Sequence, residues 1–140
     1  MIKILVPVDG SDNALRAVEK AVAWLRDRGP FELHLLNVQP ALGGDVSTFV
    51  GSAAVKGFHK EEGEKALAGA RALLDKQGIP YKPHITVGPA GESVAGFAKK
   101  LGCDGIVMGT RGMGKVKGAV LGSVSTDVIR CAEVPVTLVK

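Results

Sequence analysis

The sequence predicts a single α/β domain: an open parallel sheet of five strands, with helices on both faces. Short apolar runs rich in β-branched residues alternate with segments of helical periodicity along the 140 residues. Glycines end three of the helical segments, and no linker or low-complexity stretch divides the chain. Strands that alternate with helices form a parallel sheet with right-handed crossovers, so residues 1–140 are expected to make one domain.

The first strand is Ile2–Val8, a near-continuous apolar run of the kind that is covered on both faces of a sheet. Ser11 or Asp12 can cap the helix that follows. In this helix apolar residues recur at 3–4 spacing, and a Gly-Pro pair ends it. Phe31–Val38 is predicted to be the second strand.

In the middle of the chain, Gln39–Ala54 contains glycine and serine, shows no clear periodicity and is predicted to be a loop. An apolar face then marks a second helix, which ends at Gly78. Tyr81–Val87 follows as the third strand, and a third helix closes at Gly102.

The last third of the chain contains the predicted fourth strand, Gly105–Met108, a short helix, Ser123–Cys131, and the final strand, Val134–Val139. Five glycines fall within the 14 residues that follow the fourth strand. Glycines let a backbone approach a ligand closely and turn its N–H groups inward. The start of the short helix adds free N–H groups and a partial positive charge. The segment Gly109–Ser123 is therefore predicted to bind phosphate.

The distribution of charge supports an anionic ligand at this segment. The net charge is +4, and the last 42 residues hold the whole surplus, with 7 basic and 3 acidic side chains. No acid lies between Gly105 and Thr126, a stretch that carries an arginine and two lysines. Every Phe, Tyr and Trp lies at or before Phe97, so this basic region has no stacking platform for bases. A small anion is favoured over nucleic acid.

Two better-known phosphate motifs fit only in part. Gly109–Lys115 matches the first seven positions of a Walker A loop, but Val116 stands where Ser or Thr would hold a magnesium ion. In the Rossmann pattern, the glycine that should follow Gly112 and Gly114 comes one position late, at Gly118. A surface loop with glycines for turns is the alternative, but it does not explain the missing acids or the flanking strand and helix.

The spacing that does fit is Gly109-x2-Gly112-x9-Gly122-Ser123. With it, and with the opening ILVPVDGS and the closing VPVTLV, the sequence resembles the universal stress protein family, whose ATP-binding members carry G-x2-G-x9-G-(S/T) at this place. The resemblance covers essentially the whole chain. It implies a sheet of order 3-2-1-4-5, in which the first and fourth strands lie side by side where the winding reverses and ligands bind beyond the strand ends.

The resemblance also implies that ATP is bound there, with or without magnesium or manganese held through its phosphates. Asp9 suits the ribose, because a carboxylate accepts hydrogen bonds from hydroxyls but repels a polyphosphate at close range. A turn residue is the alternative role for Asp9. Val38 is expected to close over the base. The expected nucleotide contacts are Pro7, Val8, Asp9, Val38, Met108, Gly109, Arg111, Gly112, Gly122, Ser123, Val124 and Ser125.

The family resemblance, together with the phosphate-binding features, implies a cytoplasmic stress-response protein that binds ATP as a nucleotide-dependent switch. Hydrolysis needs a group that orients water, and the motif regions hold no acid besides Asp9. Slow ATP hydrolysis, nucleotidyl transfer by an enzyme of related fold, and a nucleotide-free interaction module stay open as alternatives. A nucleotidyl-transfer relative would be expected to carry an SGGxDS loop after the first strand, and Val8–Asp12 lacks the paired glycines.

Two further expectations concern location and assembly. No apolar run approaches the roughly 20 residues that span a bilayer, so neither a membrane span nor a leader is predicted, and the histidines show no metal-ligand spacing. In the order 3-2-1-4-5 the final strand, Val134–Val139, lies at a sheet edge, and an uncovered apolar edge invites pairing with another chain. A homodimer through this strand is therefore expected, as the family resemblance also implies.

Overall fold

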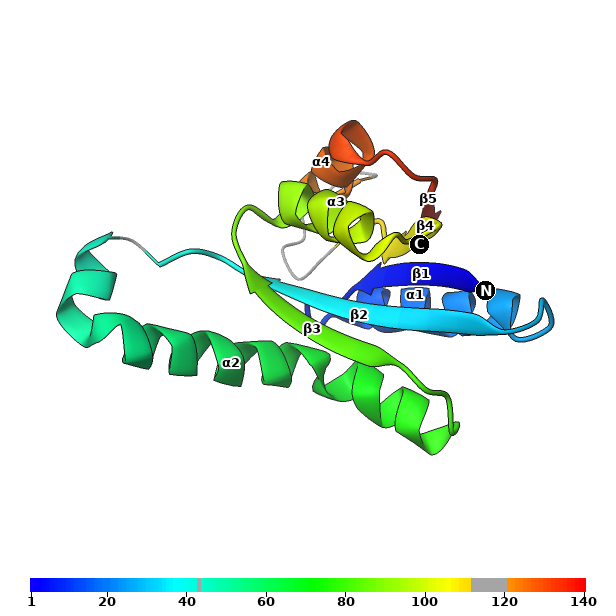
Figure 1. The fold of residues 1–140 in the computed structure, drawn as a ribbon, viewed down its shortest axis with the longest axis horizontal. Coiled ribbons are helices and arrows are strands. Elements are labelled where there is room, and N and C mark those ends of the chain that lie inside the picture. Colours follow the sequence, from blue (N-terminus) through cyan, green and yellow to red (C-terminus); the bar gives the residue numbers. More distant parts are fainter. Residues whose placement is uncertain (43, 112–120) are drawn as a thin grey trace.

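The structure, a computed structural model, describes residues 1–42, 44–111 and 121–140, with only the backbone described at 44–50. It confirms the predicted α/β class and strand order, with one parallel sheet of order β3-β2-β1-β4-β5 (Figure 1). In chain order the elements are β1 (Ile2–Pro7), α1 (Asp12–Leu25), β2 (Phe31–Gln39), α2 (Gly44–Lys76), β3 (Lys82–Val87), α3 (Ala90–Leu101), β4 (Gly105–Gly109), α4 (Ser123–Cys131) and β5 (Val136–Val139).

The central strand, β1, is paired differently with its two neighbours. It pairs with β2 along its whole length, from Ile2 to Pro7. Its pairing with β4 is limited to Ile4 and Leu5, although both strands continue toward their carboxyl ends. Beyond Leu5 the two strands separate. In open α/β sheets, ligands bind at such a point, where the winding of the chain reverses.

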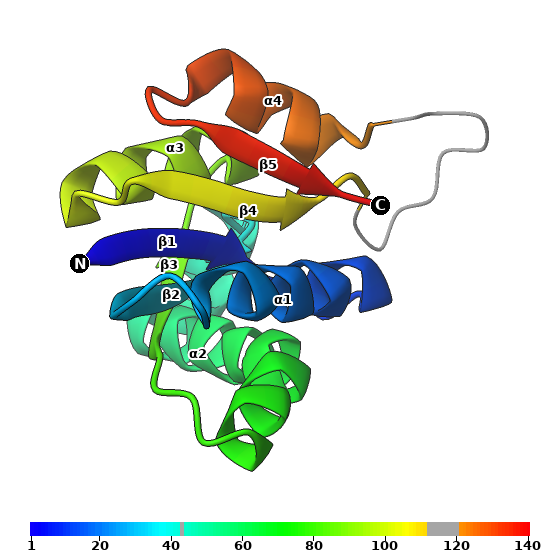
Figure 2. The same ribbon diagram turned by 90° about the vertical axis from the view of Figure 1, so that its right-hand side faces the viewer.

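The helices cover both faces of the sheet, with α1 and α2 on one face and α3 and α4 on the other (Figure 2). Neighbouring residues of β1 serve opposite faces, because side chains alternate along a strand. Val6 belongs to the apolar core under α1 and α2, with Val18 and Leu67. Leu5 belongs to the core under α3 and α4, with Val94. Each of these side chains is at least 99% buried, and such burial contributes about 1.5–3 kcal/mol per side chain.

The turn between β1 and α1 follows its sequence closely. Gly10 has a φ of 89°, in the left-handed region that glycine adopts most readily. Ser11 is the N-cap of α1, and its Oγ accepts a hydrogen bond from the N–H of Ala14 at 3.2 Å. Of the two candidate caps, Ser11 is therefore the one that the structure confirms.

The predicted loop over Gln39–Ala54 is wrong from Gly44 onward, where α2 begins. The helix is interrupted at Gly51, whose φ of 78° and ψ of 161° are not helical. Its first turns extend past the ends of β2 and β3 (Figure 1), and residues 51–54 are exposed. The glycine and serine content of this segment is typical of a loop, and Gly51 breaks the helix within it, so the sequence favoured a loop there.

Most strand ends agree with the prediction to within one residue. The exception is β5, which begins at Val136 instead of Val134. Pro135 has no N–H to contribute to a ladder, but its carbonyl accepts a hydrogen bond from the N–H of Ile106 at 2.9 Å. Pro135 is therefore hydrogen-bonded to β4 one residue before β5 begins. In the strand order, β5 lies at the edge of the sheet.

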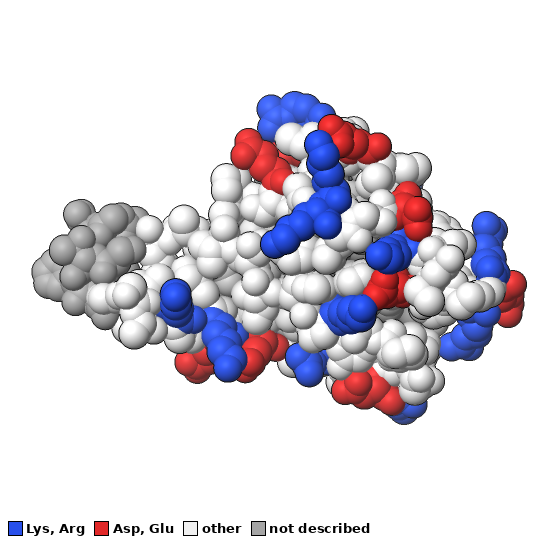
Figure 3. Space-filling model, viewed as in Figure 1, with Lys and Arg blue, Asp and Glu red and all other residues white. Residues whose placement is uncertain are grey.

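Acidic and basic side chains are interspersed over the face formed by α2, β3 and α3 (Figure 3). On α2, for example, Lys65 forms ion pairs with Glu61 and Glu62. Exposed pairs of this kind contribute little to stability. Within the described ranges, no helix combines the length and apolar character needed to cross a membrane.

Candidate functional site

A pocket of about 300 Å³ opens at the carboxyl ends of β1 and β4, where these strands separate. Its volume lies at the lower end of the range for small-molecule sites, about 300–1,000 Å³. The structure brings together in its lining every residue that was expected to contact the ligand, apart from Gly112, which lies outside the described residues. These lining residues are Pro7, Val8, Asp9, Val38, Met108, Gly109, Arg111, Gly122, Ser123, Val124 and Ser125.

Asp9 lines the pocket from the turn between β1 and α1 and is exposed to solvent. Its Oδ1 accepts a hydrogen bond from the N–H of Ser11 at 3.0 Å. Asp9 therefore does act as a turn residue, as the alternative interpretation held, because its side chain bonds the backbone two residues on. The same turn places its carboxylate beside the pocket, so the two roles are compatible.

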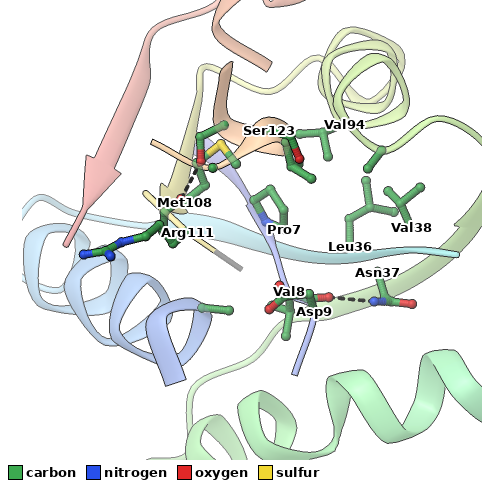
Figure 4. A pocket seen from close by; sticks show the side chains of 16 residues that line it. Pro7, Val8, Asp9, Leu36, Asn37, Val38, Val94, Met108, Arg111 and Ser123 are labelled. Carbon is green, nitrogen blue, oxygen red and sulfur yellow. Dashed lines mark hydrogen bonds between the residues drawn. The ribbon is translucent and has the colours of Figure 1, made fainter. Parts of the chain in front are cut away.

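Asn37 also lines the pocket, although no local sequence pattern pointed to it. The residue is 3% exposed. Its Nδ2 donates to the carbonyl oxygen of Val8 at 2.8 Å (Figure 4), and its Oδ1 accepts from Nε2 of Gln39 at 2.7 Å. A buried amide requires such partners. The bond to Val8 ties the carboxyl end of β1 to β2, and the bond from Gln39 fixes the orientation of the Asn37 amide, so the backbone that leads to Asp9 is held in place.

Apolar side chains form one side of the pocket. Leu36, Val38 and Val94 lie together there, and Met108 and Arg111 lie on the other side (Figure 4). Leu36, Val94 and Met108 are almost fully buried, which fixes their positions. A largely apolar wall with a few polar groups is the usual lining of a small-molecule site, and this wall suits the face of a flat heterocycle.

The first turn of α4 lines the pocket with its N-cap, Gly122, and the three residues that follow. The first N–H groups of a helix have no partner within the helix and carry a partial positive charge. The first turn of α4 contains no acidic residue. Gly122 has ordinary extended backbone angles, φ −77° and ψ 170°, so the backbone does not require glycine there. What Gly122 supplies is the absence of a side chain beside the pocket.

Ser125 was expected to offer a hydroxyl to the ligand, but its Oγ is engaged elsewhere. It lies 2.9 Å from the carbonyl oxygen of Gly109 and 3.0 Å from that of Thr110, and the residue is 2% exposed. A hydroxyl has only one proton to donate, and here it is directed at the main chain. Ser125 therefore connects α4 to the end of β4, and Ser123 is the exposed serine at the start of the helix.

Gly109 is a glycine for a reason that the motif did not suggest. A Cβ at this position would collide with Oδ1 of Asn13 and would lie 2.6 Å from its Cγ. It would also lie 3.1 Å from the carbonyl oxygen of Asn13. Close packing against α1 thus requires the glycine, whereas the sequence had suggested close approach of a ligand.

The remaining lining residues are Ala14, Leu36, Asn37, Ala90 and Val94. Ala90 is the first residue of α3, and Ala14 lies in the first turn of α1. The general rule that ligands collect at the carboxyl ends of the strands also implicates the helix starts that follow those ends. That rule, applied to each strand, could have found Ala14 and Ala90; a motif search could not.

A second group of polar side chains lies on β2 and β3, outside the pocket. Nδ1 of His34 and Nε2 of His84 are 2.8 Å apart and their rings are stacked. Burial, and then repulsion by His34, lowers the pKa of His84. A hydrogen bond from Lys82 lowers the pKa of Glu32. Among the described residues, no three His, Cys, Asp or Glu side chains are grouped so as to hold a metal ion.

Comparisons of sequence agree on one family. The family model described as "Universal stress protein family" matches residues 1–140. Universal stress protein MJ0531 of Methanocaldococcus jannaschii is 33% identical, in an alignment that covers 99% of this chain and 81% of that protein. A universal stress protein of Thermus aquaticus is 35% identical, with 98% of this chain and 97% of that protein covered.

Solved structures show the same fold. Protein MJ0577 of Methanocaldococcus jannaschii superposes with a TM-score of 0.85 at 31% identity, over 99% of this chain and 95% of that one. A universal stress protein solved in complex with cAMP superposes with a TM-score of 0.71 at 25% identity, over 99% and 97% of the two chains. From the family model, the curated relatives and the shared fold, we conclude that this chain belongs to the universal stress protein family.

Proposed function

We propose that this protein binds ATP in the pocket at the carboxyl ends of β1 and β4, and that it acts as a nucleotide-dependent switch in a cytoplasmic stress response. The observation that carries the proposal is the chemistry of the pocket lining. The lining contains the carboxylate of Asp9 and the apolar wall around Val38. It also contains the N-terminus of α4, whose first turn has no acidic residue. The similar protein solved with cAMP binds an adenine nucleotide too, which supports the same ligand class here.

Each part of ATP has a matching part of the pocket. The adenine ring would pack against Val38 and Val94, since flat rings favour apolar surfaces. The ribose hydroxyls would donate hydrogen bonds to the carboxylate of Asp9. The phosphates would accept hydrogen bonds from the N–H groups of Ser123 and Val124 in the first turn of α4, where the helix dipole favours negative charge. A magnesium or manganese ion would be bound through the phosphates.

The proposal assigns retention of ATP to the protein, not rapid turnover. Hydrolysis requires a group that orients the attacking water, and Asp9 is already engaged with Ser11 and assigned to the ribose. Besides Asp9, the described lining of the pocket contains no acid and no imidazole that would activate the exposed hydroxyl of Ser123. Slow hydrolysis at the bound phosphates is compatible with this arrangement.

The protein is further proposed to form a homodimer through β5. Among the described residues, this strand is paired on one side only, with β4. Val136 and Leu138 are half-buried against the core under α3 and α4, while the outer edge of the strand offers N–H and C=O groups for pairing. Two copies related by a two-fold axis would satisfy both edges at once.

The direct test is to identify any nucleotide that copurifies with the protein, by acid release and mass analysis, and then to titrate the emptied protein by calorimetry. ATP is expected to bind, and sustained turnover is expected to stay well below about 1 per second, an ordinary enzymatic rate. If cAMP binds more tightly than ATP, then cAMP, and not ATP, is the ligand of this pocket. Failure to bind any nucleotide would favour an interaction module, and rapid turnover would favour an enzyme.

A further inference from the structure

Asn13 is buried beside the pocket without lining it, and it contacts two other segments of the chain. It lies in the first turn of α1 and is 8% exposed. Its Oδ1 accepts a hydrogen bond from the N–H of Arg111 at 2.8 Å, and its Nδ2 donates to the carbonyl oxygen of Val139 at 3.0 Å. Because both ends of the amide are bonded, its orientation is fixed.

The contacts of Asn13 continue to the start of α4. Gly109, at the end of β4, packs directly on its side chain. The Oγ of Ser125 lies 2.9 Å from the carbonyl oxygen of Gly109, and the N–H of Gly122 donates to the carbonyl oxygen of Thr110 at 2.6 Å. A shift of the backbone at residues 109–111 would therefore shift the first turn of α4.

On its other side, Asn13 is joined to Asp9 through the start of α1. Ser11 caps this helix two residues before Asn13, and its N–H binds the carboxylate of Asp9. Asn13 thus connects the turn that holds Asp9 to the backbone that holds the N-terminus of α4. These are the parts of the pocket that are assigned to the ribose and to the phosphates, and they come from opposite ends of the sequence.

We propose that Asn13 is a positioning residue: it holds the end of β4, and through it the N-terminus of α4, at a fixed place relative to Asp9. This proposal rests on the proposed function, in which the α4 N-terminus binds the phosphates. Asn13 thereby sets the affinity for the phosphate part of the nucleotide without touching it. The contact with Val139 supplies the second anchor, at the end of β5.

The test compares ATP with adenosine, which lacks phosphates, in calorimetric or NMR titrations of Asn13→Ala. Loss of the acceptor for Arg111 and of the donor to Val139 should weaken ATP binding about tenfold or more, the effect of one unsatisfied buried group. Adenosine binding should change less than about threefold, because Asp9 keeps its hydrogen bond to Ser11 and the apolar wall stays packed in the core under α3 and α4. A purely structural role would weaken both ligands alike.

Controls separate positioning from loss of stability. Asn13→Leu removes both hydrogen bonds but fills the space with a side chain of similar shape, so it leaves no cavity. This variant replaces Asn13→Ala in the titrations if Asn13→Ala folds poorly. Val22→Ala removes buried volume from the far part of α1, and it should lower the melting temperature while ATP affinity stays unchanged. In the wild type, ATP should slow hydrogen exchange of the Arg111 amide more than adenosine does.

The outcomes distinguish this inference from the proposed function. If the wild type binds no ATP, the proposed function fails. If the wild type binds ATP and both Asn13 variants bind it with wild-type affinity, the positioning role is refuted. Equal losses for ATP and adenosine, or equal protection of the Arg111 amide by both ligands, would refute it as well.

Discussion

Replacing Gly109 with alanine should destabilise this protein, although alanine is ordinarily favoured over glycine in regular structure. The added Cβ would overlap Oδ1 of Asn13 and would lie 2.6 Å from its Cγ. Asn13 cannot turn aside without breaking its hydrogen bonds to Arg111 and Val139. The carbonyl oxygen of Asn13, 3.1 Å from the new Cβ, is held by α1. The new Cβ therefore clashes with Asn13, which cannot move away without losing hydrogen bonds.

The magnitude follows from two independent considerations. Overpacking of a well-packed region costs about 1–3 kcal/mol. If Asn13 rotates instead, the loss of two hydrogen bonds costs about 0.5–1.5 kcal/mol each. Both routes give a decrease of about 1–3 kcal/mol in the free energy of unfolding. For a chain of this size, that decrease corresponds to roughly 3–6 °C in Tm per kcal/mol.

Urea unfolding, followed by circular dichroism and by the fluorescence of Trp24, the single tryptophan, measures this effect. Gly96→Ala is the matched control, because a Cβ there meets nothing within 4 Å and Gly96 lies inside α3. It should raise stability by about 0.5–1 kcal/mol. In an Asn13→Ala background, the penalty of Gly109→Ala should shrink, since only the carbonyl contact remains. A Gly109→Ala protein as stable as the wild type would refute this account of the packing.

Three other predictions concern the ligand, pH and assembly. Asp9→Ala should weaken ATP more than inorganic triphosphate, because only ATP carries a ribose; equal losses in calorimetry would place Asp9 in another role. The pKa of His84 is lowered from its ordinary 6.5 by burial and by His34. As the pH falls, His84 is therefore protonated in the unfolded chain before it is protonated in the folded protein. The free energy of unfolding should therefore fall as the pH drops below about 6.5 and stop falling for this reason at the folded-state pKa. His84→Gln should flatten that dependence in urea titrations, and an unchanged slope would exclude this imidazole as its source. Replacing both Val136 and Leu138 with lysine should give monomers or unfolded protein, and a wild type that sediments as a monomer at micromolar concentration would contradict the proposed dimer.

The sheet could be predicted because its strands are short apolar runs with clear ends. Ile2–Val8 needed no tertiary information, since a strand that is buried on both faces is apolar throughout. The start of α2 could not be predicted in this way. Its first residues, Gly44–Ala54, include glycines and serines that are typical of a loop, and Gly51 interrupts the helix there.

The same contrast holds at the site. Asp9 and Gly122 stand in local patterns that follow strand ends or begin a helix, so sequence alone placed them at one edge of the sheet. Asn13 and Asn37 act through hydrogen bonds to residues far away in the sequence, and such pairings leave no periodic signal. The engagement of the Ser125 hydroxyl with Gly109 is equally long-range. Local sequence patterns can therefore reveal which residues form a site. The residues that hold them in place can be identified only once the fold is known.

The measurement that tests the central claim most directly is a calorimetric titration of ATP into the nucleotide-free wild type and into Gly122→Val. The extended backbone at Gly122 accepts valine, so the variant should keep its circular dichroism spectrum while its side chain occupies space beside the N-terminus of α4. The wild type is expected to bind one ATP per chain, and Gly122→Val is expected to bind none. Absence of binding by the wild type, or wild-type affinity in a folded Gly122→Val, would contradict ATP binding at this pocket.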